Sequence, residues 1–330
     1  MRKPSVGTVT AYGRVRFSAN YVGSISTDLQ RAFARWLEEG VALAMDRGGM
    51  PWREAFQRSG PLAFTYRAPA KAKTTSLLLG VLAPSEDQYG RPFPFCVVTE
   101  MRESAYVAGA GALPVAAERF IAEASEVCSL ARTASFPAVL AEAERRAAPS
   151  FGECARAAQD LQDWALQHDV LEKLWASLFP GEGVEGAFRA FRVLVETVVP
   201  MKTHGAIGTC RSLRLPLGRG GAAATAFWVE VVRALAGWTR TFPAAFWPAD
   251  RADGEALVCL EELAPTTFTQ LWAMRLPDPL VIDVTSEPAS GVEEHGKALS
   301  EIGSLLKSPR TRLYDLLDAL ARADAIDASR

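Results

Sequence analysis

Residues Gly80–Phe95 read GVLAPSEDQYGRPFPF and link two apolar segments through a polar turn. Leu77–Leu82 has the length of a buried β-strand, and Phe95–Val98 starts a second such strand after the turn. Pro84 ends the first run, and Gly90 lets the backbone take a positive φ within the turn. An ordinary connection whose charges only solvate the turn would give the same pattern. The stretch therefore predicts two core strands joined by a loop of defined shape.

The bulk composition is that of a globular protein. The chain has 330 residues, 49% of them hydrophobic and 22% charged, with a formal net charge of −2. It is long enough for one large domain or two. A near-neutral charge without a clustered basic face argues against nucleic-acid binding. We also find no apolar run of about 20 residues and no apolar segment after the basic N-terminus, so we expect a cytoplasmic protein without membrane insertion.

The cysteines are odd in number and widely spaced. No pair has the C-x-x-C spacing of a zinc or redox motif. We therefore expect buried thiols, with no metal site and no disulfide framework. The five positions are Cys96, Cys128, Cys154, Cys210 and Cys259.

Periodicity predicts strands on both sides of a helical block. A helix is expected from about Ser26 to Arg47, with Thr27 and Gln30 as its capping box. Residues 113–200 are rich in Ala, Glu and Arg, and we expect them to be largely helical, with one continuous helix over about 153–178. Strands are expected at 6–17, 62–66, 77–82, 95–99, 213–217, 244–247, 256–260 and 280–284.

This order indicates an α/β or α+β class with a mixed sheet. The late strands are too short and few for a core of their own. We therefore expect a single unit over 1–285, with 113–200 as a helical insertion within it. Residues 286–330 are expected to form a helical tail of two amphipathic helices.

The turn resembles the signature of the TagF/ImpM family of type VI secretion accessory proteins. In that signature a strand ends in Pro-Ser, Asp-x-x-Gly-Arg follows, and an aromatic-Pro pair leads into the next strand. The matching positions in this chain are Pro84, Ser85, Asp87, Gly90, Arg91, Phe93 and Pro94.

Two further segments resemble the same family. Tyr12–Val22 follows an aromatic-Gly-Lys-Leu-Pro-x-x-Gly-Asp-Phe-Val run without a gap, and Arg35–Gly40 resembles its Arg-Trp-Leu-x-x-Gly. Arg16, Ala19 and Asn20 depart from the first pattern, and the last two remove a carboxylate and a position suited to positive φ. The resemblance is close over about residues 7–100 and loose over 205–275.

Membership of this family would imply a three-layer α/β/α sandwich and no known enzymatic activity or cofactor. Relatives are post-translational repressors of type VI secretion. They act in the cytosol by binding a forkhead-associated-domain scaffold protein, which the resemblance makes the expected partner here.

The signature loop supplies the candidate site. Asp87 and Arg91 could pair across the turn as an exposed ion pair worth about 0–1 kcal/mol, which would shape the loop. Alternatively, Arg91 and the neighbouring aromatic residues could face a partner, since both types are enriched at binding hot spots. The candidate partner-binding or signature-loop residues are Asp87, Tyr89, Gly90, Arg91, Phe93, Gly13, Arg14 and Tyr21.

Two other functions compete with this interpretation. Thr203, His204 and Cys210 lie close together before a glycine-rich segment, as in a hydrolase or ligand-binding enzyme. Their spacing alone does not place a base beside the thiol, and the segment lacks the ending of a P-loop, so we expect no catalytic site. The chain could also be a structural subunit of the secretion apparatus that docks through tail helices 292–323.

Overall fold

The computed structural model describes residues 7–67, 76–106, 111–167, 170–204, 211–238, 242–251, 253–286, 296–308 and 311–322. Within these residues, nine strands form one mixed sheet in the order β2-β1-β5-β4-β3-β7-β8-β6-β9. The strand bounds are β1 Val9–Gly13, β2 Val22–Gly23, β3 Leu62–Arg67, β4 Leu77–Ala83, β5 Phe95–Met101, β6 Ser212–Pro216, β7 Ala244–Pro248, β8 Glu255–Cys259 and β9 Val281–Asp283. The paired strands are antiparallel except β6 and β9, which run parallel. The predicted mixed α/β fold is confirmed.

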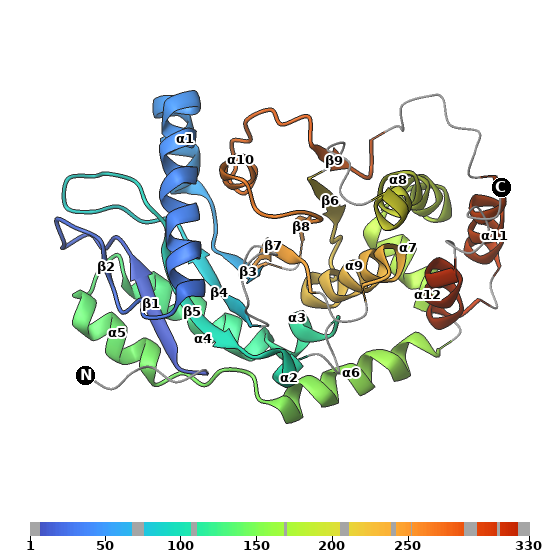
Figure 1. The fold of residues 1–330 in the computed structure, drawn as a ribbon, viewed down its shortest axis with the longest axis horizontal. Helices are drawn as coiled ribbons and strands as arrows, with labels where there is room; N and C mark the ends of the chain where they lie inside the picture. The colour runs from blue at the N-terminus through green and yellow to red at the C-terminus, as the bar shows by residue number, and fades with distance from the viewer. Residues whose placement is uncertain are drawn as a thin grey trace.

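One face of the sheet is covered by α1 (Asp28–Arg58) and α10 (Pro265–Phe268), which contact each other. Figure 1 shows α1 crossing in front of the strands. The helix begins at the predicted capping box, where the backbone N–H of Gln30 donates to Thr27 Oγ1 over 3.2 Å. Gly49 has a φ of 54°, which kinks the helix just before Pro51. The helix predicted to end at about Arg47 therefore continues past a kink to Arg58.

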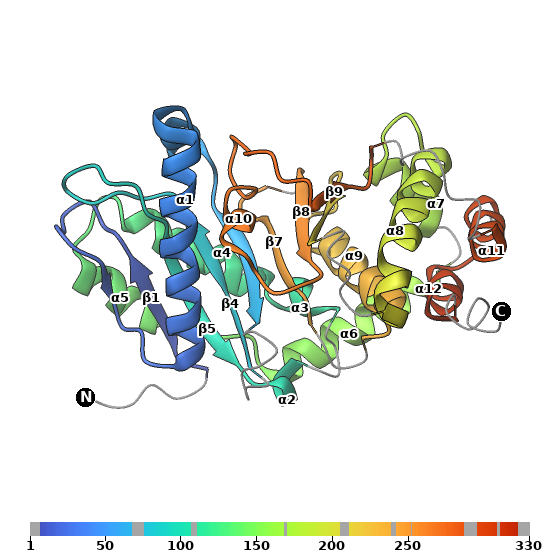
Figure 2. The same cartoon turned by 45° about the horizontal axis from the view of Figure 1, so that its top comes forward.

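The other face is covered by helices that include α4 and α9, and Figure 2 shows them behind the strands. The bounds of the remaining helices are α2 Glu103–Tyr106, α3 Leu113–Ala116, α4 Glu118–Leu130, α5 Phe136–Glu144, α6 Phe151–Ala165, α7 Val170–Leu178, α8 Val184–His204, α9 Gly221–Ala236, α11 Gly296–Lys307 and α12 Leu313–Arg322. None of these described helices has both the length and the apolarity needed to cross a bilayer.

Strand β4 is buried on both sides, which explains its continuous apolar sequence. Leu79 and Val81 belong to the core beneath α4 and α9, whereas Leu78 and Leu82 belong to the core beneath α1. Two cores on opposite faces of one sheet are the three-layer α/β/α arrangement that the family resemblance implied.

The tail helices pack against the rest of the molecule. α11 contacts α8, and α12 contacts α9 and α6. Leu316 and Leu320 of α12 are fully buried in the same core as α9. The apolar face of this helix is thus covered within the chain. The proposed boundary at residue 285 stays a prediction.

Two further predicted elements differ from the structure. The strand expected over 6–17 is limited to β1, because residues 14–21 leave the sheet edge to form a loop. The single helix expected over 153–178 is divided into α6 and α7, with α6 ending at Ala165.

Candidate functional site

The two loops that carry the motif matches lie side by side at one end of the sheet. β1 and β4 both pair with β5, so the β1–β2 loop (residues 14–21) meets the β4–β5 loop (residues 84–94). Ser85 Oγ donates to the backbone carbonyl of Arg14 over 2.7 Å, and the backbone N–H of Gln88 donates to the backbone carbonyl of Ser18 over 3.1 Å. Segments about 70 residues apart in the sequence therefore form one structural unit.

Asp87 joins the two loops. Its Oδ1 accepts hydrogen bonds from the amides of Tyr89 and Arg91, each over 3.0 Å. Its Oδ2 accepts from Arg91 Nε over 2.6 Å and lies 3.2 Å from Arg14 Nη1. The side chain is fully buried, so one carboxylate satisfies donors from both loops.

The pKa of Asp87 is lowered by these partners. Burial alone raises the pKa, but the hydrogen bonds from Arg91 and Tyr89 and the charge of Arg14 outweigh it and hold the pKa below its usual value. Asp87 is therefore a carboxylate at neutral pH, where it acts as an acceptor only.

The expectation of an exposed Asp87–Arg91 pair is wrong. The Arg91 side chain is half exposed, but Asp87 is buried, and Arg14, its second partner, is also nearly buried. The estimate of about 0–1 kcal/mol applies only to exposed pairs. Leaving a buried charge without its partner costs about 3–5 kcal/mol. Sequence spacing suggested the Arg91 contact, whereas the contact with Arg14 depends on the pairing of β1 with β5.

Aromatic rings close the unit around Arg14. Its guanidinium lies 4.5 Å from the ring centroid of Tyr21, and Tyr21 contacts Phe93 edge-on at 4.7 Å. Phe93 in turn packs against Tyr12 at 5.8 Å. Cation–π and edge-to-face contacts of this kind fix the position of the arginine side chain. Phe93 is fully buried, so it is a core residue of the loops and not an exposed contact for a partner.

Two glycines allow the loops to approach. Gly13 has a φ of 140°, and a Cβ there would lie 2.3 Å from the Pro94 carbonyl oxygen. Gly90 has a φ of 72° in the turn that Asp87 closes. Both conformations are available to glycine at little cost. The motif glycines are therefore explained by backbone geometry.

The exposed part of the unit is an aromatic rim, formed by Phe17, Tyr21 and Tyr89. Their exposed fractions are 64%, 42% and 68%. Arg91 lies 5.4 Å from the Tyr89 ring and also donates to the Ala19 carbonyl. Phe17 was not among the predicted site residues, although a large aromatic residue between polar residues at the end of a predicted strand is a usable signal.

The departures at Ala19 and Asn20 are compatible with the loop. Ala19 contributes its backbone carbonyl, which any residue supplies. The backbone N–H of Asn20 donates to Ser18 Oγ over 3.3 Å. Among the described residues, positive φ values occur at glycines alone, so neither position requires a glycine here.

The structure describes only part of the alternative enzymatic site. Thr203 and His204 form the end of α8, and Cys210 lies outside the described residues. Cys96, Cys128, Cys154 and Cys259 are buried thiols, as predicted. Burial raises the pKa of Cys128 to about 12, which makes it a poor nucleophile. The described residues contain no group of side chains suited to holding a metal ion.

Comparison with known proteins identifies the part of the chain that carries this unit. Residues 10–146 match the family model of the TagF N-terminal domain, type VI secretion system-associated. A search of curated proteins gave no match. Among solved structures, PA0076 from Pseudomonas aeruginosa PAO1 aligns at 20% identity over 46% of this chain and 78% of that chain, with a TM-score of 0.38. The predicted TagF/ImpM resemblance is confirmed over the matched residues, which the family model describes as a type VI secretion system-associated domain.

Proposed function

We propose that this protein is a non-enzymatic repressor of type VI secretion, because residues 10–146 match the TagF N-terminal domain. It acts in the cytoplasm by binding a forkhead-associated-domain scaffold protein of the secretion system. The observation that carries the proposal is the intact signature loop, in which buried Asp87 holds two loops in one shape.

The aromatic rim is the surface that fits a protein partner best. Phe17 and Tyr89 are exposed on loops whose bases are fixed by Asp87, and Arg91 lies against Tyr89. Rigid aromatic residues next to an arginine are the usual hot spots of protein interfaces. Because the loops are already ordered, binding would require little further loss of conformational entropy.

Calorimetry with the full chain and the scaffold protein of the same secretion locus tests the proposal. We expect Phe17→Ala and Tyr89→Ala each to weaken binding by about tenfold or more. Tyr314→Ala is the matched control, because Tyr314 is a similarly exposed aromatic on α12 and lies outside the TagF domain.

Each outcome of this experiment has a clear meaning. If the folded wild-type chain does not bind the folded scaffold at micromolar concentration, the proposed partner is wrong. Binding that is unaffected by the two rim substitutions would keep the partner but assign the interface to another surface.

A further inference from the structure

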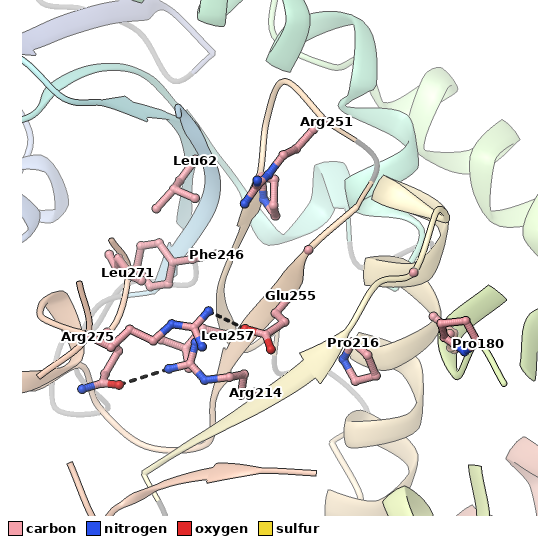
Figure 3. A pocket seen from close by; sticks show the side chains of 15 residues that line it. Leu62, Pro180, Arg214, Pro216, Phe246, Arg251, Glu255, Leu257, Leu271 and Arg275 are labelled. Atoms are coloured by element: carbon pink, nitrogen blue, oxygen red, sulfur yellow. Dashed lines mark hydrogen bonds and ion pairs between the residues drawn. The ribbon is translucent and has the colours of Figure 1, made fainter. Parts of the chain in front are cut away.

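A cleft of about 490 Å³ lies on the part of the sheet that α1 leaves uncovered. Figure 3 shows its lining, which comes from strands β3, β7, β8 and β6, from the β7–β8 loop, from the segment after α10 and from the end of α7. Apart from Leu62, its lining residues follow the TagF domain, so the cleft is independent of the proposed function.

Strand register explains why polar and apolar groups meet there. Phe246 pairs with Leu257, and Leu257 pairs with Arg214, so these side chains form one row on one face of the sheet. Side chains in such a row point the same way. Phe246 and Leu257 belong to the aromatic core beneath α1, whereas Arg214 lies next to that core and is not part of it. One wall of the cleft is thus apolar and the other basic.

Arg214 is a fixed, buried cation. Only 8% of its side chain is exposed. Its Nη1 lies 3.4 Å from Glu255 Oε2, and its Nη2 donates to Gln270 Oε1 over 3.1 Å. Glu255 is shared with Arg275, which also lines the cleft. Dashed lines in Figure 3 mark the hydrogen bond from Arg214 to Gln270 and a contact of Glu255.

Arginines outnumber carboxylates among the residues that line the cleft. Arg214, Arg251 and Arg275 line it together with one carboxylate, that of Glu255. Outside the lining, Asp253 lies 3.9 Å from Arg251 at the exposed rim, and Asp283 pairs with Arg214 in register on β9, so these carboxylates offset part of the positive charge. Burial, followed by the charge of Arg275, lowers the pKa of Arg214. An anion bound between the arginines would relieve this repulsion.

We propose that this cleft binds a small organic phosphate monoester, with its phosphate between Arg214, Arg275 and Arg251 and its apolar body against Phe246 and Leu257. The planar guanidinium groups offer paired N–H donors that match the oxygens of a phosphate. A monoester carries a charge of about −1.5 to −2 at neutral pH, which is more than a carboxylate offers to the same arginines. The volume is within the range of about 300–1,000 Å³ that small-molecule sites occupy.

Titration calorimetry of the full chain with phenyl phosphate tests this proposal. We expect saturable binding of one phenyl phosphate. Phenol lacks the anion and inorganic phosphate lacks the apolar body, so both should bind about tenfold more weakly or worse. Phenylacetate carries one negative charge and should also bind more weakly than phenyl phosphate.

Substitutions locate the binding site. Arg275→Gln should weaken phenyl phosphate binding by about tenfold, and Glu255 would keep its contact with Arg214. Arg251→Gln at the exposed rim gives a second variant that leaves the core unchanged. Arg322→Gln removes the same charge from α12, away from the cleft residues, and should have no effect.

Three results would overturn the proposal. These are the absence of saturable phenyl phosphate binding up to about 1 mM, equal effects of Arg275→Gln and Arg322→Gln, and phenylacetate binding as tight as that of phenyl phosphate. Thermal unfolding confirms that each variant is folded before it is titrated.

Discussion

Replacement of Asp87 by asparagine tests whether the buried carboxylate holds the two loops together. Asparagine has nearly the same shape, and its oxygen can still accept from the amides of Tyr89 and Arg91. Its NH₂ group would then replace Oδ2, which lies 2.6 Å from Arg91 Nε and 3.2 Å from Arg14 Nη1. Because all three groups are donors, the substitution removes both charged contacts.

The structure sets the size of the effect. Arg14 is nearly buried, and leaving its charge without the Asp87 carboxylate should cost about 1.5–3 kcal/mol, the range for a contact with a charged group. Arg91 is half exposed, so solvent screening limits its loss to about 1 kcal/mol. We therefore expect Asp87→Asn to lower the free energy of unfolding by about 2.5–4 kcal/mol at pH 7, near the cost of breaking a buried pair.

Urea unfolding of the wild type and the variant measures this difference at constant m value. Asp318→Asn is the control, because it breaks an exposed pair with Arg322 and should change stability by less than about 0.5 kcal/mol. A loss below about 1 kcal/mol for Asp87→Asn would refute the view that this carboxylate holds the loops.

The same pair of proteins gives a pH test. The pKa of Asp87 is lower in the folded state than its value of about 3.9 in the unfolded chain. At pH values between these two pKa values, the unfolded chain binds a proton at Asp87 that the folded protein does not bind. The contribution of Asp87 is complete above about pH 4 and is lost as the pH falls through the folded pKa. The stability difference between wild type and Asp87→Asn should therefore narrow below about pH 4.

Three further substitutions or reactions test other parts of the structure. Gly13→Ala should destabilise the protein by about 2–4 kcal/mol, because the new Cβ would lie 2.3 Å from the Pro94 carbonyl oxygen. Gly181→Ala is the control: Gly181 also has a positive φ, but a Cβ there meets open space, so the change should cost about 1 kcal/mol. Leu316→Ala should cost about 2–5 kcal/mol in a single unfolding transition; a separate, earlier transition would mean that the tail unfolds independently. Burial raises the pKa of Cys154 to about 11, so it should resist alkylation at pH 8 in the folded protein, and rapid alkylation of Cys210 at pH 6 would instead support a nucleophilic site.

Local signals predicted much of the fold. The capping box at Thr27, the apolar run of β4 and the break at Pro84 each depend on neighbours within a few residues, and the structure contains all three elements. The exposure of Asp87 could not be predicted in this way. It depends on Arg14, which the pairing of β1 with β5 brings close from 73 positions away in the sequence. Similarly, the sequence did not indicate a role for Arg214 within its apolar strand, because the environment of its side chain depends on where helix α1 stops covering the sheet.

The shared contacts also explain why the two motif matches occur together. Asp87 needs a cation from the β1–β2 loop, Arg14 needs the Tyr21 and Phe93 rings around it, and Gly13 permits the approach of the β4–β5 loop. Within this set, residues 19 and 20 contribute backbone groups, through the Ala19 carbonyl and the Asn20 amide. Side-chain changes at those two positions therefore leave the contacts of Asp87 intact, whereas a change at Gly13 or Asp87 alters both loops at once.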